Sequence, residues 1–246
     1  MGQVLIQKNS GEFHSINTCN AYLGFSARGF DIAFAEFPDM MSGTVPVEAD
    51  RIAVGAVAFV RKALERLGVA VPTLDYPDSL QPFLGRRIWK STLGAVRDEW
   101  QPDSPPRFVK PLEVHKAFVG YVIGAYRDLI PTARLPDHLA VWVSEPVAWI
   151  SEWRFHVLEG TLVGAGHYKG DPVRFPEARL VRDAVAEFAP EAPAAYGLDF
   201  GVTAEGETKL VEVNDAFALG CYGVDRLTYS RMLEARWGEL VGRRSA

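Results

Sequence analysis

The 246-residue chain has only two cysteines, Cys19 and Cys221, and they form neither a CxxC pair nor a metal-finger spacing. A disulfide framework is therefore not indicated, and we expect a reduced, cytoplasmic protein. No apolar run approaches the about 18 residues that a membrane span needs. The first ten residues lack the basic region and long apolar stretch of a signal peptide. The net charge of −5 gives no general electrostatic reason to bind nucleic acid or an anionic membrane.

Several common catalytic and nucleotide-binding patterns are also missing. The chain has no GxxxxGK[ST] and no GxGxxG, so the usual phosphate-loop folds are not indicated. Neither HExxH nor a local Ser/His/Asp or Cys/His arrangement occurs. The histidines are expected to be surface or core residues, although His167 is close enough to Lys169 to face the same way. The five are His14, His115, His138, His156 and His167.

What is present describes an ordinary globular protein, with 48% hydrophobic and 23% charged residues and enough length for a real core. Residues 3–7 and 30–37 read as strands. Asp50 is placed to cap a helix from Arg51 to about Leu67, and residues 69–77 give another short strand. This order predicts a small α/β lobe over residues 1–84.

The remaining residues, 85–246, predict antiparallel hairpins with interleaved helices, which is an α+β arrangement. We expect a first subdomain at 85–145 and a second at 146–246. The loop at 101–106 is rich in turn residues, and a hairpin should turn at Glu159–Gly160. Strands are expected at 107–111, 139–145, 194–202 and 208–213, and helices at 86–100, 176–188 and from Asp225 to about Val241.

Three oxygen-bearing side chains follow the two predicted strands around the turn at 203–207. Asp199 and Glu212 can sit side by side across this hairpin, and Asn214 shares the face of Glu212 because side chains alternate. Hard oxygen ligands without His or Cys favour Mg²⁺ or Mn²⁺. A solvated row of polar residues at a turn would give the same pattern, and the apolar neighbours Leu210 and Val213 argue against it.

Two lysines lie near the end of the strand at 107–111. Lys110 ends the apolar stretch RFVKP, and Lys116 lies in the following loop before Gly120. A lysine at a strand end can reach a phosphate as a compact point charge. The alternative is a pair of surface lysines with their stems along apolar surface.

Two glutamates flank a turn after the strand at 139–145. Glu145 ends that strand before Pro146, and Glu152 comes seven residues later. The free backbone groups at the turn could pair with a purine edge, and the second carboxylate could bind a ribose. Nearby tryptophans are expected to be core or packing residues.

The order of these pieces resembles the ATP-grasp superfamily over residues 86–223. The pieces are FVKP, a loop, a strand ending in Glu, a second Glu, a hairpin with a lysine, and Asp followed by EVN. The strings SEPVAWISEWR, HYKGDP and LVEVNDAFALGCYG are similar to those of a carboxylate–amine ligase-like subgroup. In that subgroup the usual phosphate-binding Arg is replaced, and a Lys can substitute. The resemblance implies an α/β N-terminal lobe followed by an ATP-grasp fold, with the nucleotide held between two β-sheet subdomains.

The resemblance also implies roles for particular residues. Lys110 would contact the α- and β-phosphates, with Lys90 as a less secure match, and loop 112–120 with Lys116 would close over the γ-phosphate. Glu145, Pro146 and Val147 would form the adenine hinge, and Glu152 would hold the ribose. Asp199, Glu212 and Asn214 would bind Mg²⁺ (or Mn²⁺).

One position departs from the superfamily pattern. Many members have an Arg two residues before the metal-binding Asp, and here that position is Gly197. The charge that develops on the transferring phosphate still needs a preorganised cation. Lys169 is the first candidate, which would also bind the nucleotide, and Arg154 and Arg174 follow.

The resulting expectation is an ATP-dependent ligase that joins a carboxylate to an amine through an acyl phosphate and releases ADP and phosphate. Its substrates would be small molecules or peptides, bound by the N-terminal lobe and around Arg86, Arg87 and Asp215. Nucleic acid and membranes are not expected partners. Two alternatives stay open, a small-molecule kinase and a nucleotide-binding module without turnover.

Overall fold

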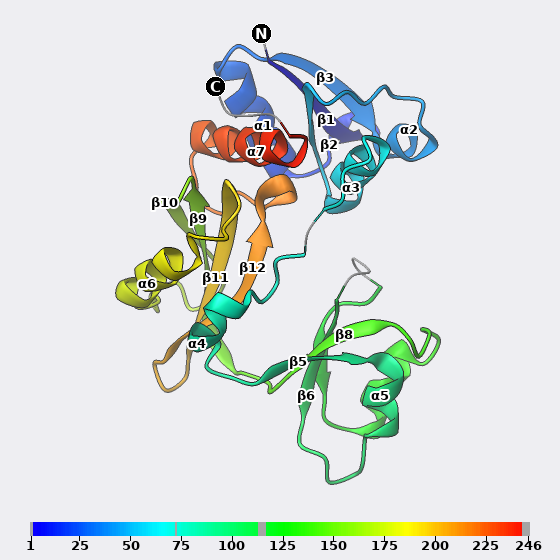
Figure 1. Ribbon diagram of the computed structural model, residues 1–246, viewed down its shortest axis with the longest axis vertical. Coiled ribbons are helices and arrows are strands. Elements are labelled where there is room, and N and C mark those ends of the chain that lie inside the picture. Colours follow the sequence, from blue (N-terminus) through cyan, green and yellow to red (C-terminus); the bar gives the residue numbers. More distant parts are fainter. Residues whose placement is uncertain (1, 72, 113–116, 243–246) are drawn as a thin grey trace. The chain divides into compact units, whose positions relative to one another are not determined.

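The computed structural model describes residues 2–71, 73–112 and 117–242 (Figure 1). Lys116 and most of the predicted closing loop lie outside these residues. The chain divides into two compact units. The large unit comprises residues 1–83 and 149–246, and the small unit comprises residues 84–148.

The N-terminal part of the large unit is a sheet built around β1 (Gln3–Asn9). It pairs in parallel with β3 (Asp31–Glu36) and β4 (Arg51–Val54), and antiparallel with β2 (Glu12–Phe13). Parallel neighbours require crossover connections, which here contain α1 (Ile16–Ala27), α2 (Phe37–Ser42) and, after β4, α3 (Val57–Arg66). The strands predicted at 3–7 and 30–37 are confirmed.

The prediction of one helix from Arg51 to Leu67 is wrong, because its first residues form β4. These apolar residues are buried beside β1, as parallel strands covered on both faces are. The helix begins only at Val57, and Gln7 accepts a hydrogen bond from the Ala56 N–H at 2.7 Å just before it. The strand predicted at 69–77 is also wrong, since its described residues make a single bridge, Asp75 to Val213.

The second sheet of the large unit is antiparallel, with the order β10-β9-β11-β12. Its strands are β9 (Trp149–Leu158), β10 (Thr161–Gly170), β11 (Ala195–Thr203) and β12 (Thr208–Asp215). The hairpin turn predicted at Glu159–Gly160 is confirmed, and both residues have positive φ (49° and 73°), as a tight hairpin turn requires.

One face of this sheet packs against a helix and the other carries polar side chains. Helix α6 (Ala178–Phe188) places Phe188 against Tyr196 of β11, with ring centroids 5.1 Å apart. Because side chains alternate along a strand, Gly197 and Asp199 lie on the opposite face from Tyr196. The turn of 3₁₀ helix η3 (Ala216–Ala218) follows β12 directly.

Helix α7 (Arg226–Leu240) connects the two sheets of the large unit and confirms the predicted C-terminal helix. Asp225 caps it by accepting hydrogen bonds from the Leu227 and Thr228 N–H groups. It lies against α1 (Figure 1), and Trp237 donates to the Ala49 carbonyl at 3.1 Å. Arg236 binds both oxygens of Asp215, which ends β12.

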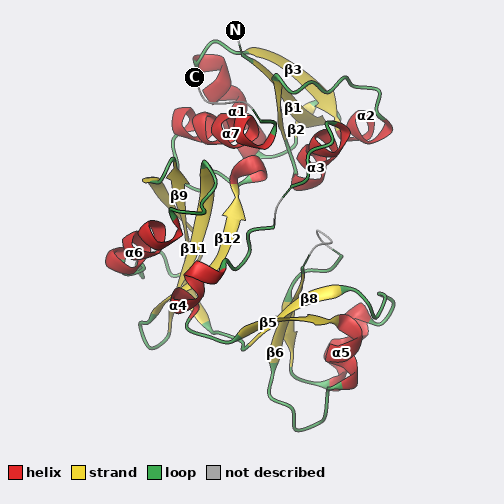
Figure 2. Cartoon of the chain, viewed as in Figure 1, coloured by secondary structure: helices red, strands yellow, loops and turns green. Residues whose placement is uncertain are grey.

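The small unit has a sheet of order β5-β8-β6-β7 with α5 (Leu93–Asp98) packed on one face (Figure 2). Its core contains Val96 of α5 together with Val109, Val141 and Val143 of the sheet. The unit also contains η2 (Tyr126–Thr132), and η1 (Asp78–Leu80) and α4 (Gln81–Leu84) precede or enter it. The strands are β5 (Ile88–Thr92), β6 (Arg107–Pro111), β7 (Tyr121–Ile123) and β8 (Ala140–Ser144).

The strands predicted at 107–111 and 139–145 are confirmed, but the helix predicted over 86–100 is largely wrong. Its first half is β5, which pairs with β8 from Ile88 to Thr92. The Thr92 hydroxyl accepts a hydrogen bond from the Ala95 N–H at 3.2 Å, so the helix starts only at Leu93. Among the described residues, no helix is long and apolar enough to cross a bilayer.

Candidate functional site

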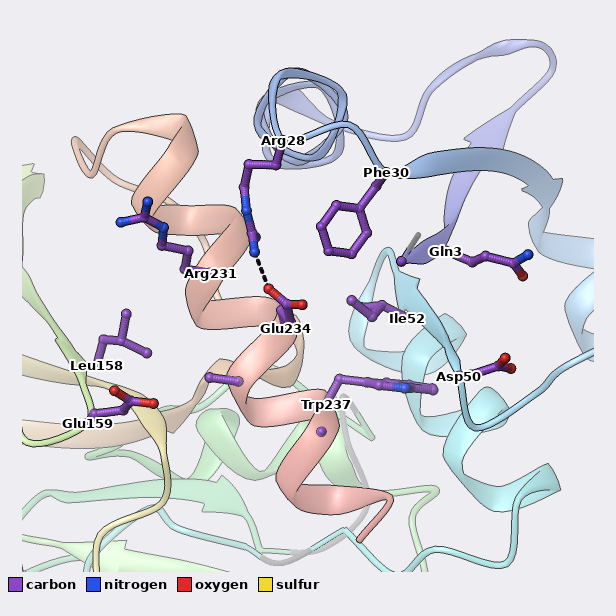
Figure 3. Close-up of a pocket in the computed structure, with 13 residues that line it drawn as sticks. Gln3, Arg28, Phe30, Asp50, Ile52, Leu158, Glu159, Arg231, Glu234 and Trp237 are labelled. Atoms are coloured by element: carbon purple, nitrogen blue, oxygen red, sulfur yellow. Dashed lines mark hydrogen bonds and ion pairs between the residues drawn. The ribbon is translucent and has the colours of Figure 1, made fainter. Parts of the chain in front are cut away.

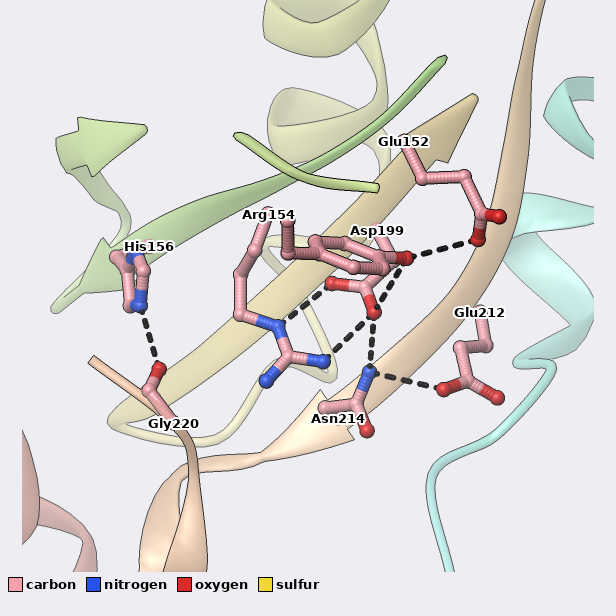
Figure 4. A network of polar contacts seen from close by, with 8 residues as sticks. Glu152, Arg154, His156, Asp199, Glu212, Asn214 and Gly220 are labelled. Carbon is pink, nitrogen blue, oxygen red and sulfur yellow. Dashed lines mark hydrogen bonds and ion pairs between the residues drawn. The ribbon is translucent and has the colours of Figure 1, made fainter. Parts of the chain in front are cut away.

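A row of polar side chains crosses the face of the large unit's antiparallel sheet opposite α6 (Figure 4). We call it the polar row; its members are Glu152, Arg154 and His156 of β9, Tyr168 and Lys169 of β10, Asp199 of β11, and Glu212 and Asn214 of β12. The strand register places Asp199 between Arg154 on one side and Glu212 on the other.

The structure brings the three predicted metal ligands together. Asp199 and Glu212 are direct partners across the β11–β12 hairpin. The Asn214 amide Nδ2 donates to Asp199 Oδ2 at 3.1 Å and to Glu212 Oε1 at 3.3 Å. Both carboxylates therefore converge on one point, which is occupied by donor hydrogens.

Arg154 makes a two-point ion pair with Asp199. Its Nε and Nη2 atoms donate to the two carboxylate oxygens, each at 2.7 Å. Asp199 is only 2% exposed, and this burial raises the pKa of its carboxyl, with Glu212 adding to the rise and Arg154 opposing it. Burial lowers the pKa of the Arg154 guanidinium, but the contacts with Asp199 outweigh it and raise the pKa above its ordinary value.

Gly197 leaves room for this arginine. A Cβ atom at Gly197 would lie 3.2 Å from Arg154 Cδ and 3.1 Å from Leu219 Cδ1, tighter than nearly all such contacts. The space where the superfamily arginine would begin is thus filled by the stem of Arg154 from the next strand. A cation is present beside Asp199 although Gly197 carries none.

Lys169 and Tyr168 bring a second carboxylate into the row. Lys169 Nζ lies 2.5 Å from Glu152 Oε1, and its side chain is 66% exposed while that of Glu152 is 7% exposed. The Tyr168 hydroxyl lies 3.1 Å from Glu152 Oε2 and 3.3 Å from Asp199 Oδ2. Burial raises the pKa of Tyr168 above its ordinary value, so the phenol stays protonated and donates.

The sequence analysis missed Tyr168. The register of β10 against β9 shifts between His167 and Lys169, and Lys169 pairs with Glu152 after the shift. A β-bulge of this kind redirects neighbouring side chains, and no residue pattern in HYKGDP announces it. Arg174, the third candidate cation, follows β10 and has its Nε 3.9 Å from the Asp171 carboxylate.

His156 lies at the buried end of the row. Its Nε2 is 3.0 Å from the Gly220 carbonyl oxygen, so this nitrogen carries the proton and donates. Within the described residues its buried Nδ1 has no hydrogen-bond partner. Burial lowers the pKa of His156 to about 4, and the Arg154 charge contributes to the lowering.

This histidine predicts a pH dependence of stability. The folded-state pKa of about 4 lies below the ordinary value of 6.5, so the unfolded state binds more protons between these values. Stability is therefore complete above about pH 6.5 and falls as the pH drops towards 4, by roughly 3 kcal/mol from this group. Urea unfolding of His156→Gln at several pH values should show a flatter acid limb than the wild type. His138→Gln is the control and should keep the wild-type slope.

The small unit carries the other predicted nucleotide-binding residues. Lys90 of β5 and Lys110 of β6 both pair with Trp142 of β8, so the two lysines flank it on one face of the sheet, opposite α5. Lys90 Nζ lies 5.1 Å from the centre of the Trp142 ring. At the strand end, Glu145 Oε2 accepts a hydrogen bond from the Arg87 N–H at 3.0 Å, just before Pro146 and Val147.

Asp215, which the sequence suggested as a substrate residue, has a structural role. Arg236 Nε and Nη2 contact its two oxygens at 2.7 and 2.5 Å, and Oδ1 also accepts from the Phe217 N–H. Both charged side chains are almost fully buried. The pair fixes the end of β12 to α7 immediately after Asn214.

The donor set of the polar row fits a divalent cation of the Mg²⁺ type. Carboxylate and amide oxygens are the ligands such cations prefer, and the amide hydrogens between Asp199 and Glu212 mark a point where positive charge is favoured. No three His, Cys, Asp or Glu side chains cluster as a metal site within the described residues. The third oxygen would therefore come from Asn214.

Solved structures with the same fold are ATP-grasp ligases, although their sequences differ widely from this chain. The D-cycloserine synthetase DcsG has a TM-score of 0.60 at 13% identity, covering 97% of this chain and all of that one. The D-alanine–D-alanine ligase of Bacillus anthracis complexed with ATP has a TM-score of 0.56 at 14% identity, covering 97% and 96%. The ligase PsnB, complexed with precursor peptide PsnA2 and AMPPNP, has a TM-score of 0.51 at 14% identity, covering 96% and 97%.

Sequence comparison identifies the family directly. No curated protein matches the chain at a significant level. A family model described as an ATP-grasp domain, the second family of its clade, matches residues 83–232, more than half of the chain. The α+β fold and the ATP-grasp prediction are confirmed, and an ATP-dependent, ADP-forming C–N ligase is supported. The chain belongs to this family of ATP-grasp domains.

Proposed function

We propose that the protein is an ATP-dependent carboxylate–amine ligase that forms an amide or peptide bond. The observation that carries this proposal is the convergence of Asp199, Glu212 and Asn214 beside a buried arginine, in a chain of an ATP-grasp family. The division into a lobe at 1–84 and subdomains at 85–145 and 146–246 remains part of this proposal.

The first step would transfer the γ-phosphoryl group of ATP to the substrate carboxylate. A carboxylate oxygen forms the new P–O bond, the bond to the β-phosphate oxygen breaks, and ADP leaves. In the second step an amine attacks the acyl carbon, phosphate departs and the amine proton is lost. Both steps need positioning and charge neutralisation more than a strong base.

The nucleotide-binding roles are distributed over both units. In the small unit we assign the phosphates to Lys110 and Lys90, and the adenine to the segment from Glu145 through Val147. Lys116 would also contact the phosphates. In the large unit Glu152 would bind the ribose. The placement of Lys90 and Lys110 on one face of their sheet supports a shared phosphate-binding role.

Asp199, Glu212 and Asn214 would hold the Mg²⁺ (or Mn²⁺) ion. Its contribution, when bound, would be to neutralise charge on the phosphates. Arg154 has two of its donors on Asp199, so its task would be to hold this carboxylate ionised and in place. Tyr168 would support the same geometry by bridging Asp199 and Glu152.

Lys169 is our candidate for the cation that contacts the transferring phosphoryl group. Its ammonium is mostly exposed while it contacts Glu152, and an ammonium has three rotatable donors, so it can turn towards a phosphate. Arg154 is the alternative source of this charge, through the guanidinium nitrogen that does not contact Asp199.

Lys169→Met should separate these roles. We expect kcat to fall by about 10²-fold, the effect of removing one preorganised transition-state donor, with a much smaller change in the KM for ATP. Unfolding should barely change, because the side chain is largely exposed. Arg174→Met is the matched control, since Arg174 is 62% exposed and pairs with Asp171, and it should retain wild-type turnover. A change in ATP affinity alone would show that Lys169 is not the phosphoryl-transfer cation.

The proposed activity is testable without knowing the substrate. ADP release would be measured with amino acids, short peptides and small carboxylates, each with and without an amine donor. Peptides belong in the panel because PsnB was solved with a precursor peptide. A ligase should release ADP and phosphate together with an amide product.

A further inference from the structure

A cavity of about 560 Å³ opens in the large unit, on the side of α7 that faces the hairpin turn at Glu159 (Figure 3). Its floor is apolar and is formed by Phe30, Ile52, Leu158 and Trp237. Trp237 and Ile52 are almost fully buried. This volume and lining are those of pockets that enclose a small molecule.

The cavity lies apart from the polar row. Leu158 follows Arg154 by four positions along β9, which at about 3.3 Å per residue is roughly 13 Å. The Phe30 and Ile52 walls come from the start of the N-terminal strands, away from β12. None of the cavity residues has a part in the proposed ligase chemistry.

The charges at the cavity rim divide into a satisfied pair and two open groups. Arg28 is paired with Glu234 and also donates to the Ser230 hydroxyl, so these charges cancel. Arg231 and Glu159 are exposed, and neither side chain has a hydrogen bond or ion pair with any residue that the structure describes. An open cation and an open anion thus border one apolar cavity.

We propose that this cavity binds a small zwitterion, an α-amino acid with an aromatic or branched apolar side chain. Arg231 would contact the carboxylate with its planar, two-point donor geometry, and Glu159 would accept from the ammonium group. The side chain would pack on Phe30 and Trp237. A ligand with one charge would leave one rim group without a partner, so both charges are needed for full affinity.

Calorimetric titration of the full chain, without nucleotide or metal, tests this site. L-phenylalanine and L-leucine should bind saturably and raise the Tm. N-acetylphenylalanine lacks the ammonium and phenylalaninamide lacks the carboxylate, so each should bind at least tenfold more weakly than phenylalanine. Because the measurement uses no ATP, its result is independent of the proposed ligase activity.

Variants locate the binding. Arg231→Ala and Glu159→Gln should each weaken it at least tenfold, whereas the matched controls Arg226→Ala on α7 and Glu187→Gln on α6, both exposed, should leave it unchanged. Ala235→Phe fills the cavity from α7 and should abolish binding while the protein still melts cooperatively. The proposal is overturned if neither amino acid binds, if the blocked forms bind equally well, or if binding survives the cavity variants. Binding lost in Glu212→Gln but retained in those variants would place the ligand at the polar row instead.

Discussion

Glu212→Gln is expected to lower ATP-dependent turnover by about 10³-fold or more. Glu212 and Asp199 supply the two negative charges that converge on the proposed cation site, and glutamine removes one of them with almost no change of shape. Loss of a single preorganised electrostatic group at a reacting phosphate is enough for an effect of this size. The measurement is ADP formation at saturating ATP over a range of Mg²⁺ concentrations.

The matched control is Glu207→Gln in the same hairpin. Glu207 is exposed and its carboxylate lies 2.7 Å from Lys209 Nζ in a surface ion pair, which contributes little. This variant should retain wild-type turnover and Mg²⁺ dependence. If Glu212→Gln also retained them, the assignment of the β11–β12 hairpin as the cation site would be wrong.

Arg154→Met should lose both turnover and stability. The change leaves the Asp199 carboxylate buried without its partner, and breaking a buried ion pair from one side typically costs about 3–5 kcal/mol. Turnover should fall by at least about 10²-fold, because Asp199 would no longer be held ionised and in place. Urea unfolding and ADP release on the same preparations measure the two effects.

A double variant separates stability from catalysis. Adding Asp199→Asn to Arg154→Met removes the stranded charge, so much of the stability should return while turnover stays lost. Lys169→Met, in contrast, should affect turnover alone. An Arg154→Met protein with the wild-type free energy of unfolding would contradict the buried pair as the support of the site.

The metal set could be predicted from sequence because it depends on local rules. The turn at 203–207 fixes a hairpin, and alternation along a strand then places Asp199, Glu212 and Asn214 on one face. The two lysines of the small unit follow from the same logic, since each lies in a strand that pairs with β8.

The parts that the sequence misrepresented depend on tertiary context. The apolar stretch Arg51–Val54 reads like the start of the following helix, and only its burial beside β1 makes it a strand. β5 is similarly short and runs directly into α5, so its residues read as part of that helix. Short apolar runs do not distinguish the two states without the partner strand.

Contacts between distant residues were also beyond reach. That the stem of Arg154 fills the space above Gly197 depends on the pairing of β9 with β11, and Tyr168 enters the row through a bulge. The Asp215–Arg236 pair joins a strand end to a helix placed by packing. Each of these needs the register or the fold, not the local pattern.

The most direct test of the central claim is product analysis by ³¹P NMR and mass spectrometry, on a carboxylate and an amine identified by the ADP-release panel. The account predicts ADP, phosphate and an amide in equal amounts, formed only when both substrates are present and absent in Glu212→Gln. A stable phosphorylated product that forms without an amine would instead show a kinase. AMP and pyrophosphate as products, or no substrate-dependent turnover at all, would also contradict the ADP-forming ligase proposed for this chain.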